Sequence, residues 1–341
     1  MEIKTIGIDI GKTWFHVVGC NRAGAPIIRH KFNRTKLLGF LINLPGCLIG
    51  MEACPGSQHL ARVLQLHGHE VRLIAPKFIK PYVKGQKNDF NDAAAIAEAV
   101  ARPSMRFVAP RSVEQLDLQA IHRVRARLVG ERTAVINQIR AFLLEYGLPV
   151  GRGPSALRNN LAALLDDAGN ALSGVMRQVV ARLREHWKYL EAQIDCCMRE
   201  IETVAQRNND CHRLTSIPGI GVLTATAMLA AIGNASNFRK GRELAAWLGL
   251  VPKQRTTGGK PTLMGISKQG NGYVRRLLVH GARSLVQHLR REKHEIGHWI
   301  TDLEQRAHRN VVIVAVANKM ARIAWAVLAK QETYRPLTSA A

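Results

Sequence analysis

Two long stretches of this sequence, 112–146 and 171–207, carry apolar residues at helical spacing and limit the folds open to the chain. Their acidic and basic residues are interspersed and nearly balanced, as in helices that pack against one another. With 341 residues, the chain is also too long for one ordinary core. We therefore predict three parts: an N-terminal domain, 1–111, a helical hairpin or coiled-coil arm, 112–205, and a C-terminal domain, 206–341. The arm is expected to act as a spacer and oligomerisation element.

Positive charge is concentrated in the two terminal parts. The chain has 49 Lys and Arg against 25 Asp and Glu, a formal charge of +24. The basic and acidic counts are 16 and 7 in residues 1–111, 12 and 11 in 112–205, and 21 and 7 in 206–341. Because a positive surplus of this size attracts polyanions, nucleic acid is the expected partner. A merely solvated basic surface is the alternative.

The N-terminal part has the pattern of a mixed α/β domain. Three β-branched runs, 3–9, 13–20 and 27–32, predict an antiparallel meander. The elements expected after it are, in order, a strand ending at Glu52, a helix over 57–67, a strand over 71–74 and a helix from Asp89.

Four acidic residues of this domain lie at the ends of these elements. Asp9 ends the first strand in GIDIGKT, and Glu52 ends another in GMEACPG. Asp89 and Asp92 stand three apart at the start of the helix in KNDFNDAAA, a spacing that places both on one helix face. Clustered carboxylates can hold Mg²⁺ for phosphodiester chemistry. We predict that the four side chains converge on a magnesium site.

Three members of this set also have an ordinary explanation. Asp89 can cap the helix while Asp92 complements the helix dipole. The GIDIGKT run around Asp9 also matches the phosphate-binding turn of actin-like ATPases and sugar kinases. Such an ATPase would need further glycine-rich nucleotide motifs in a second copy of the fold, and residues 112–205 have a helical pattern instead.

The C-terminal part is expected to be mainly helical. It opens with RLTSIPGIG, whose Gly219 and Gly221 resemble a helix-hairpin-helix turn that lets backbone N–H groups approach a phosphate. A tight connection between packed helices explains the same residues equally well. A dense basic and aromatic segment suited to phosphate contact and base stacking follows; it comprises Lys253, Arg255, Lys260, Lys268, Tyr273, Arg275 and Arg276.

The order and context of these motifs resemble the DEDD transposases of bacterial insertion sequences, whose relatives include Piv-type DNA invertases. The resemblance covers the Asp of GID, the Glu of MEA and the D-x-x-D before an alanine-rich helix, and it continues through SIPGIG, AAWLGLVPKQ, TGGK and GISKQGNGYVRRLL. It implies a RuvC-like (RNase H-like) N-terminal domain and a C-terminal transposase domain. The Mg²⁺ ligands that it implies are Asp9, Glu52, Asp89 and Asp92.

The resemblance also implies a covalent mechanism. The family places a nucleophilic serine shortly after the G-L-x-P segment, where it forms a covalent link to a DNA phosphate. The matching position here is Thr257, whose extra methyl group stiffens the side chain and crowds its hydroxyl. Thr256 and Ser267 are the alternatives, and 256–259 can also be only a loop. The family's active sites are understood to be completed by the acidic residues of another subunit.

Partners follow from the same resemblance. Members of the group use a structured bridge RNA, encoded by the element, to choose donor and target DNA. We therefore expect this chain to bind element ends, target DNA and a guide RNA, and to form a homo-oligomer.

The combined prediction is a Mg²⁺-dependent transposase, a site-specific recombinase that cuts and exchanges DNA strands through a covalent hydroxyl–phosphate intermediate. Two other functions use the same residues. A junction-resolving nuclease would cut with water and leave no adduct. A non-enzymatic nucleic-acid-binding protein would use the acidic residues only as helix caps and surface charges.

The cysteines and apolar segments predict the cellular location. The six cysteines form no C-x-x-C pair and no secretion signal precedes the first strand, so we expect a reducing bacterial cytoplasm, not a disulfide scaffold or zinc ribbon. The apolar run 311–329 is interrupted by Asn318, Lys319 and Arg322, which predicts a buried helix and not a membrane span.

Overall fold

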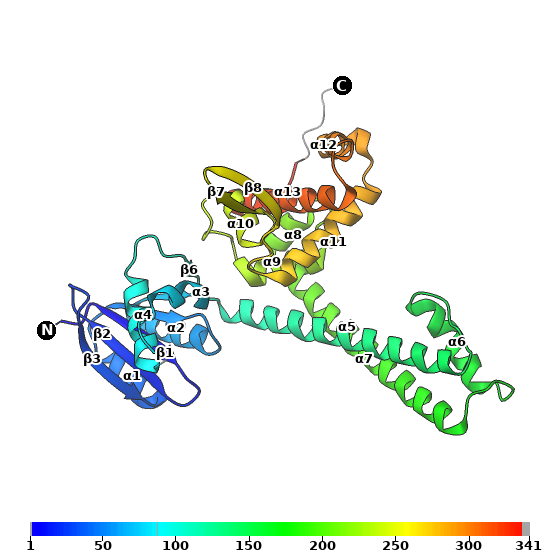
Figure 1. Cartoon of the computed structure of the whole chain (residues 1–341), viewed down its shortest axis with the longest axis horizontal. Coiled ribbons are helices and arrows are strands. Elements are labelled where there is room, and N and C mark those ends of the chain that lie inside the picture. The colour runs from blue at the N-terminus through cyan, green and yellow to red at the C-terminus, as the bar shows by residue number, and fades with distance from the viewer. Residues whose placement is uncertain (1, 87, 336–341) are drawn as a thin grey trace. The chain divides into compact units, whose positions relative to one another are not determined.

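The computed structural model describes residues 2–86 and 88–335. The chain forms two compact units, 1–112 and 113–341, and each is described by itself (Figure 1). The further division of the second unit into an arm and a C-terminal domain stays a prediction.

A six-stranded sheet in the order β3-β2-β1-β4-β5-β6 forms the centre of the first unit. Its first three strands are antiparallel, as the predicted meander requires, whereas β4 runs parallel to β1 and β5 parallel to β4. This mixed α/β arrangement is consistent with the expected RNase H-like domain. The strands are β1 (Thr5–Ile10), β2 (Phe15–Cys20), β3 (Pro26–Phe32), β4 (Leu48–Glu52), β5 (Glu70–Ile74) and β6 (Phe107–Val108).

Helices cover both faces of this sheet, and alternate residues of β1 mark the two faces. Ile6 and Ile8 are fully buried in a core that they share with α1 and α2. On the other face, Gly7 lies so close to α4 that an added Cβ would overlap Ala93 and Ala97. Small residues therefore bring α4 close to the sheet. The helices are α1 (Arg34–Ile42), α2 (Ser57–Leu66), α3 (Pro76–Ile79), the 3-10 helix η1 (Lys80–Tyr82) and α4 (Asp89–Val100).

Two long antiparallel helices, α5 and α7, pack side by side in the second unit (Figure 1). They confirm both long helices predicted from the sequence. Their apolar residues share a core with α6 that includes Ile139, Leu157 and Trp187. The helices are α5 (Val113–Glu145), α6 (Pro154–Asp166) and α7 (Gly174–Gln206).

The rest of the second unit packs around two apolar helices, α9 and α13. It is mainly helical, as expected, with one two-stranded hairpin, β7–β8, that the sequence pattern did not predict. The elements are α8 (Asn209–Thr215), α9 (Val222–Ile232), α10 (Gly241–Trp247), β7 (Pro252–Thr257), β8 (Lys260–Ile266), α11 (Gly272–His288), the 3-10 helix η2 (Arg291–Lys293), α12 (Glu295–Glu304) and α13 (Arg309–Lys330).

Helix α13 is the one helix, within the described residues, that is long and apolar enough to cross a membrane. One of its faces is part of the core, where Val316 and Met320 are fully buried. Because its other face carries Asn318, Lys319 and Arg322, its packing is that of a core helix, as the sequence predicted.

Candidate active site and nucleic-acid interface

The carboxylates of Asp9 and Glu52 lie at one edge of the sheet. Asp9 is the penultimate residue of β1 and Glu52 is the last residue of β4, and the two strands are parallel neighbours. Gly50, two residues before Glu52, would overlap Val100 of α4 if it carried a Cβ, at 2.8 Å. Because alternate residues share a face, Asp9 and Glu52 both lie on the face that α4 covers.

The other two acidic residues, Asp89 and Asp92, lie in the first turn of α4. The cap of this helix is Asn88, whose side chain accepts a hydrogen bond of 2.8 Å from the N–H of Phe90. The interpretation of Asp89 as the helix cap is therefore wrong. The side chain of Asn88, the preceding residue, already accepts the hydrogen bond from the free N–H of Phe90. Negative charge in this first turn still complements the helix dipole.

Asp9 interacts electrostatically with each of the other three carboxylates, and Glu52 interacts also with Asp92. Burial raises the pKa of Asp9 most, and repulsion from Asp92, Asp89 and Glu52 adds to it. Burial, followed by repulsion from Asp92, also raises the pKa of Glu52. Asp9, Glu52 and Asp92 are partly buried and Asp89 is exposed, and the carboxylates repel one another where they interact.

A fifth residue, His16 of β2, joins this group. Ligand atoms of Asp9, His16 and Asp89 all lie within 4.8 Å of one another. The sequence interpretation missed His16, although Asp9 and His16 are paired across the β1–β2 hairpin. The loop between the strands is four residues long, 11–14, whereas a two-residue Gly-Lys turn would pair Asp9 with Trp14, so the pattern around Gly-Lys alone does not identify His16.

Removing one of these charges is expected to stabilise the metal-free protein. Asp9→Asn keeps the shape of the side chain and abolishes both the burial cost and the repulsion, so the melting temperature in EDTA should rise by roughly 2–4 °C. Mg²⁺ should then raise the melting temperature of the wild type more than that of the variant. Thermal denaturation of both proteins, with and without Mg²⁺, measures this.

The difference in stability between the wild type and Asp9→Asn should depend on pH in one direction, which the raised pKa of Asp9 determines. Folding raises the pKa of Asp9, so the folded state binds this proton more tightly than the unfolded chain. The ionised Asp9 carboxylate therefore destabilises the folded wild type. This destabilisation is absent at pH values below the ordinary aspartate pKa, and it develops as the pH rises through the raised pKa of Asp9. The stabilising effect of Asp9→Asn should therefore shrink on acidification, and a variant that is less stable than the wild type at neutral pH in EDTA would contradict the electrostatic account.

In the second unit, the β7–β8 hairpin carries the candidate nucleophile. Thr257 is the last residue of β7, and the turn consists of Gly258 and Gly259 with φ of +57° and +75°. Both turn positions require the left-handed conformation, which only glycine adopts without strain. All residues of β7 are exposed, so the Thr257 hydroxyl is accessible to a substrate.

The strand register of the hairpin places the side chains of Thr257 and Thr256 on opposite faces. Thr257 is paired with Lys260, and Arg255 lies two residues away on the same strand face. Thr256 points to the opposite face, where its hydroxyl accepts a hydrogen bond of 3.0 Å from the side chain of Gln254. Thr257 therefore shares one face of the hairpin with two basic residues, whose charge attracts a phosphate.

Comparison with known proteins identifies the family. Residues 6–148 match a DEDD transposase family of the IS110 type, and residues 211–296 match the family described as "Transposase IS116/IS110/IS902 family". The chain is 43% identical to a probable family 20 transposase of Pseudomonas aeruginosa, over 98% of this chain and 100% of that protein. It is 42% identical to the transposase for insertion sequence element IS1328 of Yersinia enterocolitica, over 96% and 97% of the two chains.

The chain belongs to the IS110 family of transposases. It is therefore an enzyme that cuts and rejoins DNA. A more distant relative, 25% identical over 79% of this chain and 75% of its own length, is the pilin gene-inverting protein of Moraxella bovis. The competing interpretation as an actin-like ATPase also fails on the fold, because β7 and β8 are the only strands within residues 113–335.

The predicted basic segment of the transposase divides into exposed and structural residues. Lys253, Arg255 and Lys260 on the hairpin and Lys268 after it are all exposed. Arg275 instead binds the chain itself, since its guanidinium donates to the carbonyl oxygens of Leu248 and Gln269 at 2.8 and 2.6 Å.

Tyr273, from the same segment, is half-buried between α11 and α5. Its hydroxyl lies 3.1 Å from Nδ1 of His122. Burial raises the pKa of Tyr273, and it lowers the pKa of His122 to about 4, so this contact joins two uncharged groups. The guanidinium of Arg276, which is exposed, stacks over the Tyr273 ring at 5.6 Å. Tyr273 thus has a packing role within the unit.

The two glycines of the predicted helix-hairpin-helix turn have different surroundings. Gly219 has φ of +85°, and a Cβ there would lie 2.9 Å from the carbonyl oxygen of Gly281 and 2.9 Å from Met320. Gly221, the N-terminal cap residue of α9, is exposed, with nothing within 4 Å of an added Cβ. Close packing therefore explains Gly219, whereas Gly221 leaves the N-terminus of α9 open.

Alanine substitutions should separate these two roles. Gly219→Ala is expected to destabilise the transposase by about 1–3 kcal/mol, because the added methyl group meets backbone and the left-handed conformation is strained. Gly221→Ala should leave stability within about 0.5 kcal/mol. Denaturant unfolding of both variants tests this pair, and equal losses would contradict the assigned surroundings.

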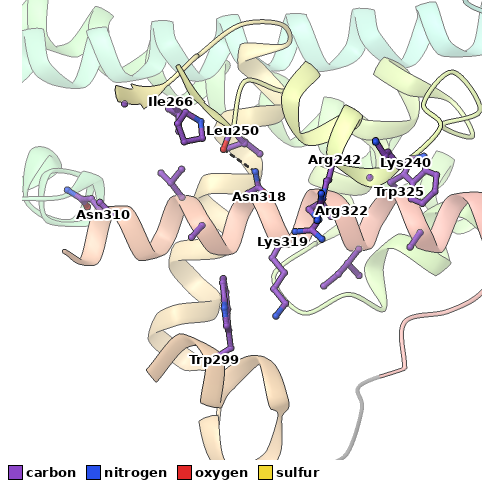
Figure 2. A pocket seen from close by; sticks show the side chains of 18 of the residues that line it. Lys240, Arg242, Leu250, Ile266, Trp299, Asn310, Asn318, Lys319, Arg322 and Trp325 are labelled. Atoms are coloured by element: carbon purple, nitrogen blue, oxygen red, sulfur yellow. Dashed lines mark hydrogen bonds between the residues drawn. The ribbon is translucent and has the colours of Figure 1, made fainter. Parts of the chain in front are cut away.

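A groove of about 1040 Å³ lies along the outer face of α13 (Figure 2). Its floor is apolar, and its charged lining residues, within the described part of the chain, are all cationic: Lys240, Arg242, Lys319 and Arg322. Trp299 of α12 stacks with the ammonium group of Lys319 at 4.2 Å, and Asn318 donates a hydrogen bond of 3.1 Å to the carbonyl oxygen of Leu250. The sequence interpretation missed this group of cations because Lys240 and Arg242 lie at the start of α10 and the other two lie on α13, far along the chain.

Proposed function

We propose that this transposase exchanges DNA strands in a Mg²⁺-dependent reaction whose covalent intermediate joins Thr257 to a DNA phosphate. The observation that supports the proposal is the electrostatic interaction of Asp9, on β1, with Glu52 on β4 and with Asp89 and Asp92 on α4, which together with burial raises the pKa of Asp9. Carboxylates with pKa values raised by burial and mutual repulsion are typical of functional sites, and in a chain with a net charge of +24 this acidic group stands out.

The four acidic residues fit Mg²⁺ as ligands. They offer hard carboxylate oxygens from three elements, and their mutual repulsion is relieved when a divalent cation is held among them. When bound, the metal would supply stabilisation of the charge that develops on phosphate and deoxyribose oxygens. The protein's own contribution is to hold Asp9 and Glu52 on strand ends and Asp89 and Asp92 on the first helical turn, so that the ligand positions are preorganised.

Thr257 supplies the nucleophile in this proposal. Its hydroxyl oxygen attacks the phosphorus atom, a P–O bond to one deoxyribose oxygen breaks, and the threonine proton passes to a base. A deoxyribose hydroxyl of the second DNA strand then attacks the phosphothreonine bond, which restores the Thr257 hydroxyl and joins the new strand. Arg255 and Lys260 beside Thr257 support the choice, because they can hold the phosphate before attack.

Nucleic acid binding is assigned to the exposed basic residues of the second unit. The hairpin cations, the open N-terminus of α9 and the cationic groove along α13 are three surfaces that suit phosphates. The resemblance to bridge-RNA-guided relatives supports a structured RNA as one occupant and DNA as the other. The proposal includes a homo-oligomer formed through the α5–α7 arm. It also includes three separate domains, a RuvC-like fold of the first domain and a cytoplasmic location.

A cleavage assay tests this function. Purified transposase is incubated with its element ends, target DNA and the RNA transcribed beside its gene, in Mg²⁺ or in EDTA. Strand exchange is expected only in Mg²⁺ and only with the RNA present. Exchange in EDTA would contradict the metal site, and RNA-independent exchange at the correct sequence would contradict guidance.

A further inference from the structure

His16 occupies an unusual position for a histidine. Only 8% of its surface is exposed, and it is the second residue of a strand, β2, whose other residues are buried as well. It is paired with Asp9 on β1 and with Lys31 on β3. The ring of Phe90 packs edge-on against the imidazole with centroids 4.8 Å apart and an interplanar angle of 78°. The orientation of the imidazole is therefore fixed by packing on the face that bears the carboxylates.

We propose that His16 is a nitrogen ligand in the metal site of this transposase, which makes the site bind Mn²⁺ in preference to Mg²⁺. The inference rests on the proposed function, because it assumes that the acidic residues hold a divalent cation. It adds a ligand, and a metal preference, that four carboxylates do not provide.

The distances between the ligand atoms fit a shared ion. Nδ1 of His16 lies 3.4 Å from the nearest carboxylate oxygen of Asp89, which is longer than a charge-assisted hydrogen bond of about 2.7–2.9 Å. The ligand atoms of Asp9, His16 and Asp89 lie within 4.8 Å of one another. Atoms bound to one ion at about 2.0–2.4 Å lie roughly 3–5 Å apart, so the three atoms are spaced as ligands of a common cation.

The chemistry of the donor atoms gives the preference. Mg²⁺ is small and hard and is bound almost entirely by oxygen, whereas imidazole nitrogen is a common ligand of transition metals. Mn²⁺ also accepts carboxylate oxygen, so the four acidic residues serve both ions and His16 favours Mn²⁺ selectively. The matched substitution is His16→Asn, because an asparagine oxygen can take the place of Nδ1 and returns an all-oxygen site.

Isothermal titration calorimetry of the full chain with MnCl₂ and with MgCl₂ tests this inference. In the wild type Mn²⁺ should bind more tightly than Mg²⁺, and in His16→Asn the ratio of the two dissociation constants should fall by roughly tenfold or more. The control is His59→Asn, which alters an exposed histidine of α2 and should leave both constants unchanged. Pulsed EPR of bound Mn²⁺ should show coupling to a ¹⁴N nucleus in the wild type and in His59→Asn, but not in His16→Asn.

The outcomes separate this inference from the proposed function. A wild type that binds both ions without ¹⁴N coupling, or whose Mn²⁺ to Mg²⁺ ratio is the same in His16→Asn, overturns the nitrogen ligand and leaves the four-acid site standing. A wild type that binds neither ion overturns the metal site and the nitrogen ligand together. The EPR measurement on the wild type needs no variant, so a failure of His16→Asn to fold does not remove the test.

Discussion

Asp92→Asn is expected to lower DNA strand cleavage by this transposase at least about a thousandfold, because the variant loses one charged ligand of the metal site. Among the nearby acids, Asp92 has the largest repulsive effect on the pKa of both Asp9 and Glu52. Asparagine keeps the side-chain shape, and salt-dependent binding of nucleic acid should remain close to that of the wild type. A plasmid-cleavage assay and a filter-binding titration measure the two properties.

The control for this variant is Glu98→Gln on the same helix. Glu98 pairs with Arg102 and Lys84 at 2.7 and 3.1 Å, away from the cluster, and exposed pairs of this kind contribute about 0–1 kcal/mol to stability. Glu98→Gln should therefore cleave at the wild-type rate. Cleavage by Asp92→Asn at the wild-type rate would contradict the proposed metal site.

Thr257→Ala is expected to abolish strand exchange, with a loss of about a thousandfold or more, because no hydroxyl remains to attack the phosphate. Thr257→Ser should retain exchange or increase it, because serine keeps the oxygen and removes the methyl group that restricts it. Recombination between element ends and target, followed by amplification across the new junction, measures both variants.

Thr256→Ala is the matched control one residue earlier. Its hydroxyl lies on the opposite strand face and is bonded to Gln254, so exchange should persist. Loss of exchange in Thr256→Ala together with normal exchange in Thr257→Ala would transfer the nucleophile to Thr256.

Much of the first unit could be predicted from sequence because its signals are local. The three β-branched runs became β1, β2 and β3, and the alanine-rich run after Asp92 became α4. The positions of the four acidic residues on their elements could be predicted because each stands at the end of a strand or in the first turn of a helix, and parallel strand ends meet at one edge. The assignment of the helix cap was wrong by one residue, since Asn88 and Asp89 are both good caps and only the backbone decides between them.

The features that the sequence analysis missed depend on how residues distant in the chain are placed in the folded structure. Identifying His16 requires the register of the β1–β2 pair. Because His16 is buried in a strand of buried residues, its sequence context is that of a core residue. The β7–β8 hairpin has exposed strands without apolar alternation, so its only local signal was the Gly258–Gly259 turn. The groove on α13 gathers cations from α10 and α13 that are some 80 residues apart in the chain, which no local pattern reveals.

The central claim is a covalent recombination step, and a denaturing gel tests it most directly. Purified transposase, Mg²⁺, labelled element ends and the flanking RNA are mixed, stopped with detergent and compared between the wild type and Thr257→Ala. The account predicts a labelled protein–DNA adduct in the wild type that is absent from Thr257→Ala and from a protease-treated sample. Cleaved DNA without any adduct in the wild type would contradict it and would identify instead a nuclease that cuts with water.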